Sequence, residues 1–265
     1  MALLVAFTAV VLAGMLALSG PQNAAPPERP TPQPAPPPAS VTPTPRAANA
    51  AARQDEVVRR VQDAKGNVPL VFVGDSITQG WEQSGKRFWD ATVDSFAALR
   101  GSPLTALNLG VGGDRTEHVL WRLREAPLTP LDPRAVVLMI GTNNIGHDAV
   151  NPEETLLGVR TIVELLLAQC PNAKVILFAI FPRGERMNPM RGDLCQINQA
   201  LATLASDRVH FIDIGSQFVT NDGALRNDLM PDFLHLSPAG YAIWAHELTA
   251  PLSAALLQDA ALKKP

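Results

Sequence analysis

Short apolar runs alternate along most of the chain with longer segments in which apolar residues recur every three or four positions. The short runs lack the polar–apolar alternation of a half-exposed strand, which is typical of parallel strands buried on both faces. The spacing in the segments between them favours helices that cover a sheet. The predicted strands are Leu70–Val73, Leu104–Leu109, Ala135–Ile140, Lys174–Ile180 and Val209–Ile214.

The helical segments complete a repeating strand–helix order. We therefore predict a three-layer α/β/α sandwich with a five-stranded parallel sheet. Sheets of this kind bind ligands just outside the carboxyl ends of their strands, so candidate chemistry is sought there. The predicted helices are Ala50–Ala64, Phe88–Leu99, Thr116–Arg124, Pro152–Gln169, Met190–Ala205 and Pro238–Leu257.

The first fifty residues do not share this rhythm. Residues 1–19 are almost entirely apolar, and 11 of the 25 residues from Pro21 to Pro45 are proline. Because proline donates no backbone hydrogen bond, we predict an extended, disordered linker over residues 21–49 and a folded domain over residues 50–265. A fragment that begins at Ala50 is then expected to keep full activity.

The apolar segment over residues 1–20 has two interpretations. A signal peptide has such a hydrophobic centre, and Ala17-Leu18-Ser19 offers a small-x-small cleavage site. No Lys or Arg precedes Arg29, however, so the basic region of a usual signal peptide is missing. The alternative is an uncleaved membrane anchor, although about 18 helical residues are slightly short for a bilayer core. Both interpretations predict export, to a secreted or periplasmic location.

Charge and composition exclude several other functions. The formal net charge is −3 and no basic cluster occurs, which disfavours a nucleic-acid surface. The five histidines include no H-E-x-x-H pair, and two cysteines alone cannot build a zinc site, so we expect no metal and no cofactor. A predicted strand separates Cys170 from Cys195. We therefore expect two buried free thiols at opposite ends of the domain.

A serine follows the first predicted strand, in Val73-Gly74-Asp75-Ser76-Ile77-Thr78. A serine in this place is exposed at the start of a helix, where the helix dipole favours developing negative charge. Taken alone, a helix-capping role explains Ser76 as well as a catalytic one does. The chain contains no G-x-S-x-G elbow, which disfavours an α/β-hydrolase.

Two further strand ends carry groups that could bind an oxyanion. Asn108-Leu109-Gly110-Val111-Gly112-Gly113-Asp114 follows the second strand, and Arg115 stands where a dinucleotide-binding loop would have its last glycine. Tight glycines leave backbone N–H groups free to point at an anion. Gly141-Thr142-Asn143-Asn144 follows the third strand and offers a side-chain amide. A plain turn explains either segment alone, but not their meeting at one edge of the sheet.

The last loop supplies a candidate base. Asp232-Phe233-Leu234-His235 precedes Ser237-Pro238, which is typical of the N-cap and first residue of a helix. A neutral histidine can take a proton from a serine, and a carboxylate on its other nitrogen fixes the tautomer. The pair could be an accidental surface spacing if it stood alone. Together with Ser76 and the two glycine-containing segments it predicts a nucleophilic active site.

These segments resemble the four sequence blocks of the SGNH, or GDSL, hydrolase family. The blocks are Gly74-Asp75-Ser76, Gly113, Gly141-Thr142-Asn143 and Asp232-x-x-His235. More narrowly, the chain is similar over about residues 55–257 to the catalytic subunits of the intracellular type I platelet-activating-factor acetylhydrolases. That likeness is carried by residues 112–123, by Pro182-Arg183-Gly184-Glu185 and by residues 232–236.

The resemblance implies a flavodoxin-like SGNH hydrolase fold and a serine esterase. It implies Ser76 as the nucleophile, His235 as the base and Asp232 as the group that orients the histidine. It also implies an oxyanion hole made of the N–H groups of Ser76 and Gly113 and the side-chain amide of Asn143.

An acyl pocket lined by Ile77, Thr142 and Leu234 is implied in the same way. We therefore predict hydrolysis of short-chain, above all acetyl, esters through an acyl-serine intermediate. The alternatives are a lysophospholipase or thioesterase that uses the same site, and a non-catalytic binding module on a tether. The family's intracellular members form dimers, so the resemblance leaves a homodimer as one expectation. Membrane attachment through the N-terminal segment is a second expectation.

Overall fold

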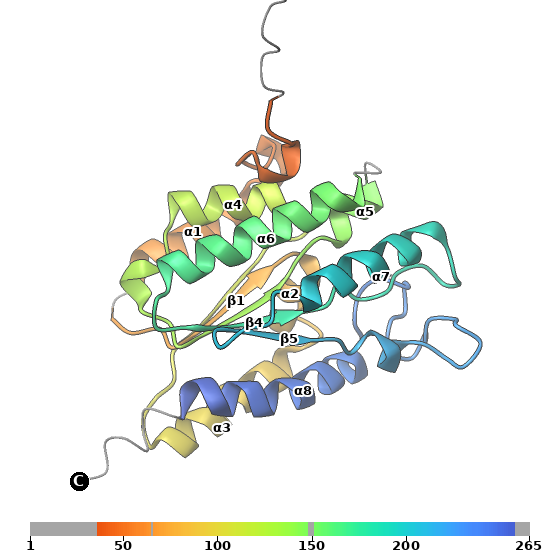
Figure 1. Cartoon of the computed structure of the whole chain (residues 1–265). Helices are drawn as coiled ribbons and strands as arrows, with labels where there is room; N and C mark the ends of the chain where they lie inside the picture. Colours follow the sequence, from red (N-terminus) through yellow and green to blue (C-terminus); the bar gives the residue numbers. More distant parts are fainter. Residues whose placement is uncertain (1–35, 65, 148–150, 258–265) are drawn as a thin grey trace, which may run out of the picture. The chain divides into compact units, whose positions relative to one another are not determined.

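Five parallel strands form the central sheet in the order β2-β1-β3-β4-β5 (Figure 1). The computed structural model describes residues 36–257, apart from residues 65 and 148–150. The predicted three-layer fold with a five-stranded parallel sheet is confirmed. The strands are β1 (Leu70–Gly74), β2 (Ala106–Gly110), β3 (Ala135–Met139), β4 (Lys174–Phe178) and β5 (Val209–Ile212).

Helices cover both faces of this sheet, and every long helix was predicted to within a few residues. Two short helices directly follow β1 and β3, and the second of them was not predicted. The helices are α1 (Ala52–Asp63), α2 (Ser76–Gln79), α3 (Lys86–Arg100), α4 (Thr116–Glu125), α5 (Thr142–His147), α6 (Pro152–Gln169), α7 (Pro189–Ala202) and α8 (Pro238–Leu256). Short 3-10 turns η1–η5 span Ala39–Val41, Ala48–Ala50, Gly80–Glu82, Thr129–Leu131 and Gly215–Phe218.

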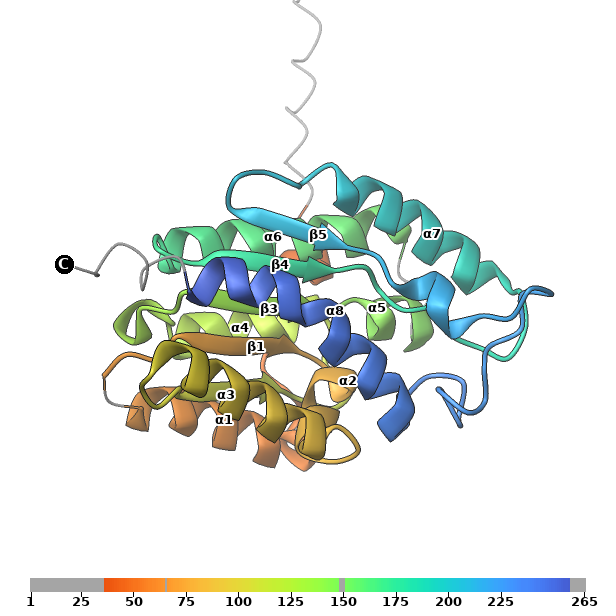
Figure 2. The same cartoon turned by 90° about the horizontal axis from the view of Figure 1, so that it is seen from below.

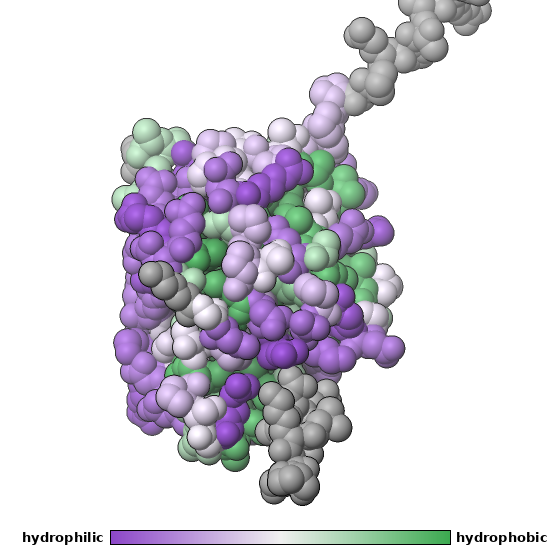
Figure 3. Space-filling view, turned by 90° about the vertical axis from the view of Figure 1, so that its left-hand side faces the viewer, coloured by the Kyte–Doolittle hydropathy of each residue, from purple (hydrophilic) through white to green (hydrophobic). Residues whose placement is uncertain are grey.

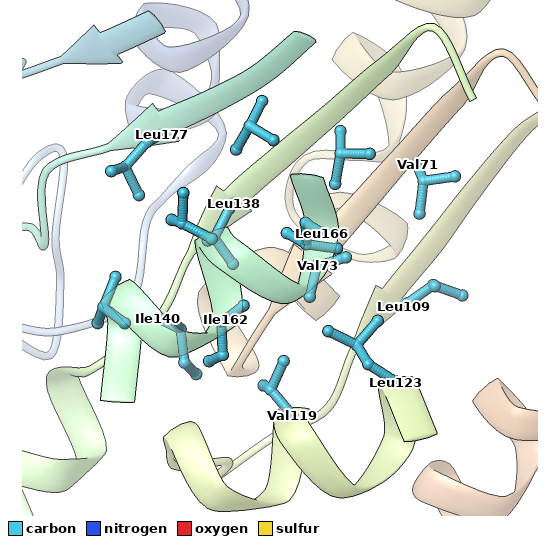
Figure 4. Close-up of a cluster of buried hydrophobic side chains, with 14 of the residues drawn as sticks. Val71, Val73, Leu109, Val119, Leu123, Leu138, Ile140, Ile162, Leu166 and Leu177 are labelled. Carbon is cyan, nitrogen blue, oxygen red and sulfur yellow. The ribbon is translucent and has the colours of Figure 1, made fainter. Parts of the chain in front are cut away.

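One face of the sheet packs against α1, α4, α6 and α7. Branched aliphatic side chains fill this layer, because alternate residues of strands buried on both faces point toward the same helices. Figure 4 shows part of this cluster, including Val71 and Val73 of β1 and Ile162 and Leu166 of α6. The face drawn in Figure 3 carries hydrophilic residues over most of its area, with smaller apolar areas between them.

The opposite face packs against α3 and α8, which lie in front of the sheet in Figure 2. Aromatic side chains fill this layer. The ring centroid of Trp81 lies 5.1 Å from those of Tyr241 and Trp244, and 5.6 Å from that of Phe72. Aromatic pairs at these distances, two edge-to-face and one tilted, add to the stability that burial alone provides. The aromatic layer therefore fixes α8 against the end of β1.

The register of the strands brings the site segments together. Gly74 at the end of β1 pairs with Gly110 of β2 on one side and with Met139 of β3 on the other. The chain leaves β1 for one neighbour and later returns to the other, so this is the switch point at which such sheets bind ligands. The loops after β1, β2 and β3 consequently start at one edge of the sheet.

Residues 36–49 differ from the predicted disordered linker. Ser40 is buried, and its carbonyl accepts a hydrogen bond from Thr116 Oγ1 at 2.9 Å. The Thr44 N–H donates to the carbonyl of Glu117 at 3.2 Å. The prediction failed because the residues between the prolines keep their backbone N–H and C=O groups, and these form short 3-10 turns and dock on the domain. Residues 1–35, with the predicted signal or anchor, lie outside the described residues.

Among the described residues no helix is long and apolar enough to span a bilayer. Both cysteines are free, but only Cys170 is buried, whereas Cys195 is exposed. The expectation for Cys195 was wrong because α7 turns Leu194 and Ile197 toward the sheet and leaves the position between them on its solvent side.

Candidate active site

The exit from β1 places Ser76 at the carboxyl edge of the sheet. Gly74 has no room for a side chain, since an added Cβ would lie 2.3 Å from the Met139 carbonyl oxygen. Asp75 then caps α2, its carboxylate accepting the Ile77 N–H at 2.9 Å. Ser76 is half-buried and begins the helix, so its own N–H has no acceptor within α2. This exit leaves both the hydroxyl and the N–H of Ser76 available to a ligand.

The candidate base reaches Ser76 across 159 residues of sequence. His235 Nε2 lies 2.9 Å from Ser76 Oγ, and His235 Nδ1 lies 2.6 Å from Asp232 Oδ2. A proton on Nδ1, donated to the carboxylate, leaves the Nε2 lone pair to accept the serine proton. The geometry is therefore a hydrogen-bonded line of a candidate nucleophile, a candidate base and a carboxylate.

Asp232 also organises the loop that carries His235. Its Oδ1 accepts the N–H groups of Leu234 at 3.0 Å and of His235 at 2.7 Å. Partial burial raises the pKa of Asp232, but these bonds and the His235 side chain outweigh burial and hold that pKa below its ordinary value. Phe233, which lies between Asp232 and Leu234, has φ +59°, a left-handed conformation that is uncommon for a bulky residue. One carboxylate thus shapes the turn and orients the imidazole.

A tyrosine links this loop to the nucleophile's helix. Tyr241, in the first turns of α8, donates from its hydroxyl to the Ile77 carbonyl at 2.7 Å. Gly80 lets the two helices approach, because an added Cβ there would lie 2.0 Å from that hydroxyl. Sequence reasoning missed Tyr241; the available signal was a tyrosine on the buried face of a helix, where its hydroxyl needs a partner.

The glycine segment after β2 is held against Ser76. A Cβ added to Gly112 would lie 3.9 Å from the Cβ of Ser76, and the Gly112 N–H donates to Gln79 Oε1 at 2.8 Å. Gly113 has φ +75°, and its N–H has no intramolecular acceptor within the described residues. This is the state expected of a donor reserved for a developing oxyanion.

Asn143 joins the same segment from the start of α5. Its Nδ2 donates one hydrogen to the carbonyl of Asp114 at 2.9 Å, which leaves the second hydrogen of the amide available. Its side chain is buried, with 3% of its surface exposed. The structure therefore brings together Ser76, Asp232, His235, Gly113 and Asn143, the residues expected to form the triad and the oxyanion hole.

The three residues expected to line an acyl pocket are placed differently from one another. Ile77 and Thr142 are almost completely buried, with 1% of each exposed, whereas Leu234 is half-buried. Both the carbonyl and the hydroxyl of Thr142 accept from Arg183, at 2.8 and 3.2 Å. Little apolar surface is consequently open to a ligand at Ile77 or Thr142.

A buried polar cluster lies behind the glycine segment, and sequence reasoning did not find it. Asp114 pairs with Arg122, and both side chains are at least 95% buried. Arg122 also donates to the carbonyls of Leu109 at 3.1 Å and Gly74 at 3.4 Å, and burial lowers the pKa of its guanidinium to about 9. The signal in the sequence was an arginine on the apolar side of a predicted helix, which requires a buried partner.

Within the part of the chain that the structure describes, no group of three or more His, Cys, Asp or Glu residues converges as metal ligands would. Ser76, His235 and Asp232 are residue types that can carry out proton transfer and nucleophilic attack.

Sequence comparison gives two kinds of match. Residues 72–243 match the family model described as GDSL-like lipase/acylhydrolase. Platelet-activating factor acetylhydrolase IB subunit alpha1 of Homo sapiens is 40% identical over 204 residues, which cover 76% of this chain and 83% of the human protein. Subunit alpha2 of Rattus norvegicus is 41% identical over 189 residues, which cover 69% of this chain and 76% of the rat protein.

Solved structures share the fold at lower identity. A GDSL-like lipase from Bacteroides thetaiotaomicron matches with a TM-score of 0.59 at 22% identity, over 76% of this chain and 97% of its own. The acetyl xylan esterase AlAXEase matches with a TM-score of 0.58 at 23% identity, over 69% of this chain and 98% of its own. Similarities at this level of identity establish the fold alone.

Proposed function

This chain belongs to the GDSL-like lipase/acylhydrolase family and is a carboxylic ester hydrolase, and we propose that it removes short acyl groups, acetyl above all, through an acyl-serine intermediate. The observation that carries the proposal is the hydrogen-bonded line from Ser76 Oγ through His235 to Asp232, with distances of 2.9 and 2.6 Å. These distances suit proton transfer from the serine hydroxyl to the imidazole.

In the first half of the proposed reaction, His235 Nε2 takes the proton of Ser76 Oγ while the oxygen attacks the carbonyl carbon of the ester. The carbonyl oxygen becomes an oxyanion, which the N–H groups of Ser76 and Gly113 and the free amide hydrogen of Asn143 stabilise. The carbon–oxygen bond to the alcohol then breaks, and His235 gives its proton to the departing alcohol. An acyl-Ser76 ester remains.

In the second half, water replaces the alcohol. His235 takes a proton from water as the water oxygen attacks the acyl carbon, and the oxyanion forms again at the same donors. The bond to Ser76 Oγ breaks, and His235 returns the proton to the serine. Asp232 stabilises the imidazolium in both halves, and its lowered pKa favours the ionised carboxylate that this role needs.

The proposed preference for small acyl groups rests on the space beside Ser76. Ile77 and Thr142 are packed into the protein, and only Leu234 offers a partly exposed apolar side chain. The names of the relatives agree in chemistry: one is an acetylhydrolase by name, and one structural neighbour is an acetyl xylan esterase. These packed side chains leave little apolar surface for a longer acyl chain.

A series of 4-nitrophenyl esters tests the proposal. We expect kcat/KM to fall at least tenfold from acetyl to octanoyl, because overfilling a packed apolar site costs about 1–3 kcal/mol. Ser76→Ala is the control and should abolish turnover of every ester. A flat or rising profile with an inactive Ser76→Ala protein would instead favour a lysophospholipase or thioesterase, and retained activity in that variant would reject the acyl-serine pathway.

A further inference from the structure

The segment that precedes α1 is packed against the domain at a glycine. Gly158 of α6 has no room for a side chain, since an added Cβ would lie 2.9 Å from the Ser40 carbonyl oxygen. That carbonyl accepts from Thr116 Oγ1, and Thr44 is bonded through its N–H to the backbone of α4. Residues 39–46, which we call the strap, are therefore fixed on α4 and α6. The strap precedes the residues 72–243 that match the family model.

Arg46 ends the strap beside the proposed oxyanion hole. Its backbone N–H donates to Oε1 of the buried Gln54 at 2.8 Å, which ties it to α1. Its Nη1 donates to the carbonyl of Gly113 at 2.8 Å, and its Nε lies 3.9 Å from Asp114 Oδ1. A Cβ added to Gly113 would lie 3.0 Å from Arg46 Nη2, so the guanidinium sits directly against this glycine.

The peptide that presents the Gly113 N–H is held from both sides. Before it, the Gly112 N–H donates to Gln79 of α2. After it, the Gly113 carbonyl accepts from Arg46. Gly113 adopts φ +75°, a conformation that glycine reaches without cost but also leaves easily. A donor that must meet an oxyanion within a fraction of an ångström requires such external fixing.

We propose that Arg46 is a positioning residue for the oxyanion hole, carried to the site by the strap. The inference rests on the proposed function, because it assigns Arg46 a part in placing the Gly113 N–H. The guanidinium fixes the Gly113 carbonyl and also faces the Asp114 carboxylate. The Asp114 carbonyl in turn accepts from Asn143, so one bonded chain joins Arg46 to two of the three proposed oxyanion donors, Gly113 and Asn143. The strap, residues 39–46, is then part of what positions the oxyanion donors.

The test uses the full chain and three variants: Arg46→Ala, Arg46→Lys and Arg208→Ala. Arg208 is the matched control, because it is a part-buried arginine that donates to the backbone carbonyls of Leu167, Cys170 and Ala173, and none of these residues belongs to the site. Each protein is measured for kcat and KM on 4-nitrophenyl acetate, for inhibition by a trifluoromethyl ketone, and for Tm. The ketone forms a tetrahedral adduct whose oxyanion occupies the hole.

Arg46→Ala should lower kcat about tenfold and lower the affinity for the ketone inhibitor by a similar factor, with KM changed less than about twofold. Arg46→Lys should recover part of both losses, because an ammonium can still donate to the Gly113 carbonyl. Arg208→Ala should lower Tm and leave kcat and ketone binding near wild type. Rates are expressed per active site titrated, so that a partly unfolded variant does not imitate a slow one.

Other outcomes are distinguishable. If Arg46→Ala lowers Tm but keeps the wild-type kcat and ketone affinity, as the control does, Arg46 only attaches the strap and the inference is wrong. If Arg46→Lys is as impaired in kcat as Arg46→Ala while Arg208→Ala is unimpaired, the position still serves catalysis through the planar guanidinium. If the wild-type chain fails to hydrolyse the ester, or Ser76→Ala hydrolyses it equally well, the proposed function falls and the inference falls with it.

Discussion

The two halves of the candidate site are built in contrasting ways. The proton-handling half is exposed: the side chains of His235 and Asp232 are 45% and 56% accessible. The half that would bind the oxyanion is backed by buried charge, with Asp114 inaccessible and Arg122 5% accessible. The first is shaped by hydrogen bonds within four consecutive residues, and the second by side chains from the strap, α2, α4 and α5.

This difference has a physical reason. A base needs its lone pair aimed at one hydroxyl, and a short turn with an internal carboxylate can do that in contact with water. Backbone N–H donors have no side-chain freedom to adjust, so they are placed only as well as the surrounding chain is fixed. We therefore expect substitutions in the exposed half to reduce rate without affecting stability, and substitutions in the buried half to reduce both.

The largest effect is expected for the base. His235→Ala should lower kcat/KM by at least about 10³-fold, because serine without a general base is a weak nucleophile. The free energy of unfolding in urea should change by no more than about 0.5 kcal/mol, since an exposed side chain contributes little packing. A loss of stability greater than this would show that the loop of Asp232 and His235 is part of the core structure, and the comparison would fail.

The next effect separates two neighbouring asparagines. Asn143→Ala should lower kcat by about 10²–10³-fold with little change in KM, the usual result of removing one oxyanion donor. Asn144→Ala is the matched control, because among the described residues its side chain bonds only to Thr116 and Glu117 in α4. It should cost about 1–3 kcal/mol of stability while changing kcat far less. Equal losses of kcat in the two variants would mean that Asn143 acts only through packing.

The smallest effect is a dependence of stability on pH. Burial, together with the positive charges of Arg46 and Arg115, lowers the pKa of His118 from 6.5 to about 4. Between these values the unfolded chain binds a proton that the folded chain does not. Stability from this residue is therefore complete above about pH 6.5 and is lost as the pH falls toward 4, by at most about 1.4 kcal/mol per pH unit.

Comparison of wild type with His118→Gln isolates this dependence. In the wild type, the backbone N–H of Arg115 donates to His118 Nδ1 at 3.0 Å. The side-chain oxygen of glutamine can accept the same hydrogen bond, but glutamine does not titrate. Urea unfolding at several pH values between 7 and 4 should show the wild type losing its advantage over the variant as the pH falls. A difference that stays constant with pH would show that the buried cluster does not suppress protonation of His118.

The sequence by itself determined most of the fold. Apolar runs without alternation gave the five strands, and the spacing between them gave the long helices, because both patterns are consequences of local backbone geometry. The parallel order then required the ends of β1, β2 and β3 to meet, which placed Ser76 beside Gly113 and Asn143. The spacing of Asp232 and His235 is also local, since a carboxylate three residues before a histidine can reach its ring within one turn.

Only the tertiary structure decided which groups hold the oxyanion segment. Arg46 and Gly113 are 67 residues apart, and Asn143 and Asp114 are 29 apart, and no local periodicity relates either pair. The proline-rich composition before residue 50 predicted a disordered linker, but residues 39–46 dock on α4 and α6. Side-chain partners of backbone groups are chosen by which surfaces meet after the layers pack, and composition does not encode that choice.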